Sequence, residues 1–268
     1  MQSFPLAPMI ASVVVLVVAI LLLVAAIIVV KLKSKGSLVS LFVGMAVFAV
    51  CFVIAIISSS VLSIFVSNLL VATIILSLRA GVVEELGRYL AFKVFLKKRN
   101  CIGDALLYGL GHGGMEVLLV LGLSAVNVLV IGFMINAGMY DVLAQGLDAT
   151  ALAAFDNQLQ TLTSAGAGMF ALSGVERLWA VIVHVSFSIM VFCSARQRKV
   201  SYLILAILLH FGFDCTTYLY HAEIVPVEIF ELLLGVIALG IGAVGVVFAR
   251  RYIAWYEAQE QTAIQTSL

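Results

Sequence analysis

Residues 9–30 read MIASVVVLVVAILLLVAAIIVV, a stretch with no charged side chain. As a helix rising about 1.5 Å per residue it is about 33 Å long, which suffices to cross the roughly 30 Å hydrocarbon core of a bilayer. The stretch is too long for the apolar core of a signal peptide, and neither a preceding positive charge nor a cleavage signal accompanies it. We therefore expect a retained membrane-spanning helix at this position.

The rest of the chain repeats this pattern. Of the 268 residues, 64% are hydrophobic and 11% are charged, whereas a soluble domain carries about 25% charged residues. The sequence predicts an all-α fold, a bundle of about seven transmembrane helices that forms one integral-membrane domain over residues 1–268. The expected spans are about 8–31, 38–60, 66–92, 104–135, 170–195, 200–221 and 226–249, and any catalytic core is expected within about 66–221.

Basic residues predict the orientation of the bundle. Twelve of the 15 Lys and Arg residues fall in alternate loops or after the last span. Because basic loops stay in the cytoplasm, the N-terminus is expected outside and the C-terminus inside. The twelve residues are Lys31, Lys33, Lys35, Lys93, Lys97, Lys98, Arg99, Arg196, Arg198, Lys199, Arg250 and Arg251.

The segment 137–169 lies on the predicted outer side and contains no Lys or Arg. Apolar side chains recur in it every four residues, which predicts an amphipathic helix lying on the outer surface of the membrane. The residues of this apolar stripe are Leu143, Leu147, Ala151, Phe155 and Leu159.

Charge and cysteine content exclude other classes. The net charge is +1 and no long basic run is present, so the expected partner is the lipid bilayer and not nucleic acid. The four cysteines show no CxxC spacing, so no disulfide framework is predicted.

Three histidines and a carboxylate pair interrupt the apolar spans. His112, His184 and His210 lie in three different spans, and Glu84-Glu85 lies in a fourth. Such residues are costly in hydrocarbon and are therefore functional candidates. Counted from the cytoplasmic end of each span, all of them lie about 12–18 Å deep. We therefore expect one polar site in the cytoplasmic half of the bilayer.

Helical spacing adds further polar residues to this site. Residues three or four apart share a helix face, and a carboxylate one turn away can orient an imidazole. The pairs with this spacing are Glu84–Arg88, Glu85–Arg88, His112–Glu116 and His210–Asp214. Four glycines within residues 109–114 flank His112, and they provide either close helix packing or room for a substrate backbone.

These motifs together resemble the YhfC family of intramembrane proteases, in the wider clan of type II CAAX prenyl proteases and PrsW-type proteases. The resemblance covers about residues 79–216, through Glu84-Glu85-Leu86-Gly87-Arg88, Gly111-His112-Gly113-Gly114-Met115-Glu116, His184 and the pair His210 and Asp214. It implies hydrolysis of a peptide bond in a membrane-associated substrate, in a bacterial cell (inner) membrane. CAAX proteases usually place the arginine one residue later and often have Asn where Asp214 stands, so a prenylated substrate is not implied.

The resemblance also implies roles for the residues that match the family motifs. Glu84 would activate water, while Glu85 and Arg88 control its charge state and orientation. His112 and His210 would donate hydrogen bonds to the oxyanion or position the water. The residues expected to contact substrate or to support these groups are Glu116, Asp214, Gly113 and Gly114.

The role of a metal is left open by the sequence. His112, His184 and His210 could form a three-histidine zinc site with water in the fourth position, although no HExxH motif is present. A glutamate mechanism without a metal needs only two of the three histidines. Both mechanisms stay open at this point.

Two functions other than proteolysis are also compatible with a polar site in the membrane. The first is a scaffold or binding protein with the same pocket but no turnover. The second is a haem- or ion-binding protein, because paired histidines at one depth can ligate haem iron. The Glu84-Glu85 pair would have no role in a haem site. The sequence does not predict the oligomeric state.

Overall fold

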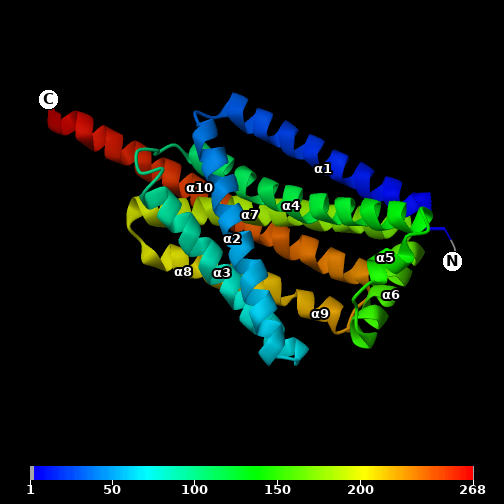
Figure 1. Cartoon of the computed structure of the whole chain (residues 1–268). Helices are drawn as coiled ribbons and strands as arrows, with labels where there is room; N and C mark the ends of the chain where they lie inside the picture. The colour runs from blue at the N-terminus through cyan, green and yellow to red at the C-terminus, as the bar shows by residue number, and fades with distance from the viewer. Residues whose placement is uncertain (1–2, 268) are drawn as a thin grey trace. The chain divides into compact units, whose positions relative to one another are not determined.

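The computed structural model describes residues 3–267, and these form α-helices joined by short loops, with no strand among them (Figure 1). The predicted all-α class is therefore confirmed. The helices are α1 (Leu6–Lys33), α2 (Leu38–Phe65), α3 (Leu69–Lys93), α4 (Ile102–Asn136), α5 (Tyr140–Ala144), α6 (Ala149–Ser164), α7 (Ala167–Gln197), α8 (Val200–Cys215), α9 (Thr217–His221) and α10 (Val227–Ser267).

The helix lengths agree with a bundle of about seven membrane spans. Within the described residues, six helical segments are long and apolar enough to cross a bilayer: α1, α2, α4, α7, the pair α8–α9 and α10. Helix α3 has 25 residues and is long enough, but it carries Arg79, Glu84, Glu85 and Arg88. It packs against α2 and α8 (Figure 1), so its polar side chains can be sheltered from lipid. The orientation of the termini stays a prediction.

Internal contacts divide the chain into two compact units. The first comprises Met1–Leu22 and Val117–Arg177, and the second comprises Leu23–Glu116 and Leu178–Leu268. The prediction of one integral-membrane domain over the whole chain is not tested by this division. Each unit is described separately below.

The first unit corrects the prediction of one long amphipathic helix at 137–169. Two helices, α5 and α6, form there because Gly146 adopts a left-handed conformation (φ 81°), which a helix cannot continue through. Asp148 then caps the start of α6 by accepting a hydrogen bond from Ala151 N (2.8 Å). Leu143 and Leu159 pack on a core of Phe4, Met9, Val128, Ile131 and Ile135. The apolar stripe therefore packs on protein at these two positions.

The second unit is built around α7, whose residues 183–195 are buried except for the partly exposed Val185. This segment contributes Phe187, Met190, Val191 and Phe192 to the core. The helices that carry polar residues surround it. A buried core helix of this kind can therefore place a histidine in the middle of the unit.

Helices α2 and α4 touch backbone to backbone in the second unit. A Cβ atom on Gly111 would collide with the carbonyl of Leu41, and one on Gly44 with the carbonyl of Tyr108. Small residues allow such close approach in membrane bundles. The crossing brings the ring of Phe48 to 5.0 Å from that of His112, so it helps to fix the position of this histidine.

Gly111→Ala should therefore destabilise the protein. Ala is the better helix former by about 1 kcal/mol, but overpacking against a backbone carbonyl costs more, and we expect a net loss of about 2 kcal/mol in the free energy of unfolding. Unfolding of the purified protein in detergent measures this. Gly122→Ala on the same helix is the matched control, because no atom lies within 4 Å of its added Cβ. Equal stability of the two variants would contradict the packing described here.

The loop between α3 and α4 is fastened to α7 by Arg196. Its guanidinium donates to the carbonyl oxygens of Arg99 (2.8 Å), Phe92 (3.0 Å) and Leu96 (2.6 Å). Carbonyls at the end of a helix lack partners within that helix, and Arg196 supplies a donor to that of Phe92 at the end of α3. This contact fixes the end of α3, the helix that carries Glu84 and Glu85.

Candidate functional site

Four helices of the second unit bring their polar side chains together. Helix α3 supplies two carboxylates and an arginine, α4 a histidine and a carboxylate, α7 a histidine, and α8 a histidine and a carboxylate. The convergence that the sequence predicted is observed as direct contacts among Glu84, Glu85, Arg88, His112, Glu116, His184, His210 and Asp214.

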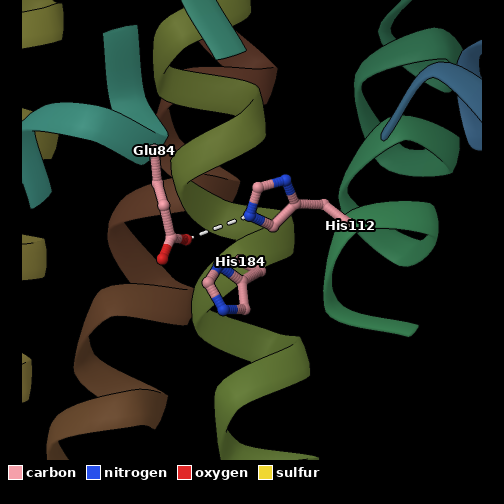
Figure 2. Close-up of side chains that lie close together, drawn as sticks. All are labelled: Glu84, His112 and His184. Atoms are coloured by element: carbon pink, nitrogen blue, oxygen red, sulfur yellow. Dashed lines mark hydrogen bonds and ion pairs between the residues drawn. The ribbon is translucent and has the colours of Figure 1, made fainter. Parts of the chain in front are cut away.

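The centre of this cluster is formed by Glu84, His112 and His184. Figure 2 shows the three side chains approaching one another from α3, α4 and α7. The Nε2 of His112 lies 3.0 Å from Oε2 of Glu84, and the two imidazole rings are 4.9 Å apart. One potential ligand atom from each of the three residues lies within 4.8 Å of the other two. These residues could hold a metal ion.

His184 is held from two sides. The NH2 group of Arg88 lies 3.2 Å from its Nδ1 and NH1 donates to its backbone carbonyl at 3.2 Å. On the other side of the ring, Nε2 lies 2.6 Å from Oε2 of Glu116. The sequence placed Glu116 beside His112, one turn earlier on α4. In the structure Glu116 contacts His184, and the ring of His112 contacts Glu84 on α3.

A second set of contacts surrounds His210. Its Nδ1 lies 2.8 Å from Oε1 of Glu85, and its Nε2 lies 3.5 Å from Asp214, so the predicted His210–Asp214 contact is present. Glu85 also pairs with Arg88 at 3.4 Å, and both side chains are fully buried. Of the two adjacent carboxylates, Glu85 is therefore the one that faces the guanidinium.

The residues that could hold a metal ion in the structure are not the three histidines that the sequence proposed. The sequence proposed His112, His184 and His210, whereas the group that converges is Glu84, His112 and His184. His210 instead has a carboxylate beside each ring nitrogen. The common depth of the three histidines could not reveal this, since depth does not specify which neighbouring helix a ring faces.

The charges of the cluster favour a bound cation. Its contacts join four carboxylates, those of Glu84, Glu85, Glu116 and Asp214, with the guanidinium of Arg88. Negative charge without a counter-charge is expensive in apolar surroundings, and protonated histidines or a divalent cation would offset it. The donor set also fits, because two imidazoles and one carboxylate are ligands that zinc accepts in catalytic sites.

The glycines beside His112 are used for packing. A Cβ on Gly113 would lie 3.1 Å from Val181 Cα and 3.4 Å from His184 Cβ, and one on Gly114 would lie 2.6 Å from the Leu23 side chain. Neither position has room for a substrate backbone. Of the two roles that the sequence allowed for these glycines, the structure therefore favours close helix packing, which in turn places His184 next to His112.

Some residues that shape the site were not identified from the sequence. Phe48 packs edge-on against His112 at 5.0 Å, and Phe187 stacks on His210 at 5.0 Å. Gly81 lets α3 approach α8, because a Cβ there would lie 2.9 Å from the carbonyl of Ile207. In a chain this apolar, nothing in the sequence distinguishes these residues from others that face lipid.

Comparison with known proteins shows the family to which this chain belongs. A profile of the YhfC intramembrane metalloprotease family matches residues 14–234, which include every polar residue of the cluster. The protein named "Uncharacterized membrane protein YhfC" of Bacillus subtilis (strain 168) is 36% identical over 149 residues, which are 55% of this chain and 57% of that protein. No solved structure matches the chain. The chain belongs to the YhfC intramembrane metalloprotease family.

Proposed function

We propose that this protein is an intramembrane endopeptidase that hydrolyses a peptide bond of a membrane-associated peptide or protein. We further propose that it uses a divalent metal ion, with zinc the expected metal, held by Glu84, His112 and His184. The observation that carries the proposal is the convergence of three ligand atoms within 4.8 Å, on two buried histidines and a half-buried glutamate. The family description supports the same reaction class.

The roles of the chain's residues follow from their contacts. When bound, the ion supplies a Lewis acid for the scissile carbonyl and lowers the pKa of a water molecule. Glu85 and Arg88 hold each other and the neighbouring histidines in place. His210 can carry a proton at Nε2, beside Asp214, and pass it to the leaving amine. Burial makes each of these interactions stronger than it would be in water.

A reaction without a metal would use the same residues differently. Glu84 would take a proton from water. His112, whose Nε2 lies 3.0 Å from Oε2 of Glu84, would orient this carboxylate. His184 would then have only a structural role. The metal-dependent reaction is the one we propose, because it uses all three converging residues and relieves the excess negative charge of the cluster.

We propose a bacterial cell (inner) membrane as the location, in keeping with the Bacillus subtilis relative, which is named a membrane protein. The test of the function is co-expression with tagged candidate membrane substrates, followed by mass spectrometry of any new terminus. Wild type should cleave a substrate that His112→Ala and His184→Ala leave intact. His221→Ala, at the exposed end of α9, is the control and should cleave normally. Equal cleavage by all variants would refute the assignment of this site.

A further inference from the structure

The two neighbours of His184 determine which of its nitrogens can ligate a cation. A guanidinium has only hydrogen-bond donors, so Nδ1, 3.2 Å from Arg88 NH2, must act as an acceptor. The proton of the neutral ring is then on Nε2, where it is donated to Glu116 at 2.6 Å. An imidazole ligates a metal through the nitrogen that has no proton, which in this arrangement is Nδ1.

We propose that Arg88 and Glu116 act on His184 in opposite senses. Glu116 keeps the ring in the tautomer that can bind a metal, whereas the guanidinium of Arg88 competes with the metal for the lone pair of Nδ1. Both are positioning residues, and the inference rests on the metal site proposed above. Metal affinity is thereby set by where the Arg88 side chain is held.

A second place for the guanidinium already exists in the structure. Oε2 of Glu85 and Nε of Arg88 are both buried without a hydrogen-bond partner, although NH1 of Arg88 is only 3.4 Å from that oxygen. A small movement away from His184 would let Arg88 hydrogen-bond to Glu85. The backbone carbonyl of His184 would keep the hydroxyl of Ser188, which donates to it at 2.7 Å. Release of His184 therefore leaves its carbonyl paired and frees Nδ1 to ligate the cation.

The contribution of Glu116 follows from the chemistry of metal-bound histidines. A carboxylate that accepts the second ring N–H fixes the ring orientation and makes the ligating nitrogen more basic. The 2.6 Å contact between Nε2 and Glu116 has this geometry. The negative charge of Glu116 also attracts a cation, whereas the positive charge of Arg88 repels one.

Metal affinity of purified full-length variants in detergent tests the proposal, with Zn²⁺ or Co²⁺ titrated against a chromophoric chelator. Glu116→Ala should weaken binding by about 10–100-fold. Arg88→Met should tighten binding by about tenfold or more, because both the competition and the repulsion are removed. Arg79→Met is the matched control. It removes an arginine from the same helix, and the described interactions place none of its atoms in contact with His184, so affinity should be unchanged.

The double variant Glu85→Gln with Arg88→Met separates two effects of Arg88. One is its competition with the metal for Nδ1 of His184, and the other is the repulsion of the cation by its positive charge. The double variant removes one negative and one positive group, so the net charge is that of wild type, and it avoids the unpaired buried carboxylate that could prevent Arg88→Met from folding. We expect the double variant to bind metal more tightly than wild type. Weaker or unchanged binding, or normal binding by Glu116→Ala, would overturn the inference.

Failure of the metal site itself would look different. If wild type, Arg88→Met and the double variant all fail to bind metal, the proposed metal site is wrong and this inference falls with it. If wild type binds metal and the variants do not shift in opposite directions, only the inference is wrong. Nitrogen NMR of the His184 ring gives an independent readout, with protonated Nε2 and unprotonated Nδ1 expected in the wild-type protein before metal is added.

Discussion

Glu84→Gln should lower the rate of substrate cleavage at least about 10³-fold while leaving the protein folded. Glutamine has the same shape as glutamate and can keep the 3.0 Å contact with Nε2 of His112. It lacks the negative charge, so it can neither take a proton nor bind a divalent cation strongly. The amide should therefore remove the chemistry without opening a cavity.

The measurement is the cleavage rate of a reporter substrate by purified variants reconstituted in vesicles. Glu228→Gln, an exposed position in the first turn of α10, is the matched control and should retain the wild-type rate. A Glu84→Gln enzyme that cleaves as fast as wild type would show that Glu84 is neither a ligand nor a base. That result would place the chemistry on other residues, whereas absence of cleavage by purified wild type would favour a scaffold without turnover.

Arg88→Met should cause the largest loss of stability among the variants considered, about 3–5 kcal/mol. Arg88 and Glu85 are both fully buried and 3.4 Å apart. Removing the guanidinium leaves a buried carboxylate without its counter-charge, and the cost of that charge dominates the effect. Combining Arg88→Met with Glu85→Gln should recover most of the loss, because a neutral amide can still hydrogen-bond to His210.

Unfolding of the three proteins in detergent, followed by circular dichroism, gives the comparison. The expected order of stability is wild type, then the double variant, then Arg88→Met. If the double variant were no more stable than Arg88→Met, the pair would contribute independent interactions and the buried charge would not be the cause. The same double variant serves in the metal titration, so both properties can be read from one preparation.

Much of the architecture could be predicted from the sequence because the bilayer imposes a simple length rule. Uncharged stretches such as residues 9–30 have one stable form in hydrocarbon, and α1 is the helix found there. The depth of His112, His184 and His210 similarly predicted that they converge, since residues at one level in adjacent helices can meet. The break of the outer segment at Gly146 was missed because a four-residue apolar repeat does not reveal a local turn.

The partners within the site could be predicted only where they lie on one helix and face each other. Spacing found His210 with Asp214, and Glu85 with Arg88. It failed for Glu116, because a shared helix face does not specify whether two side chains meet or each contacts another helix. For the same reason the third potential ligand is Glu84 on α3, where the histidine pattern suggested His210.

The metal content of purified wild type and single variants tests the central claim most directly. We expect about one zinc ion per chain in wild type, and loss of metal in Glu84→Gln, His112→Ala and His184→Ala. His210→Ala should keep its metal, because His210 lies outside the group formed by Glu84, His112 and His184. A wild-type protein that cleaves substrate without metal, or loss of metal in His210→Ala with retention in Glu84→Gln, would contradict the account.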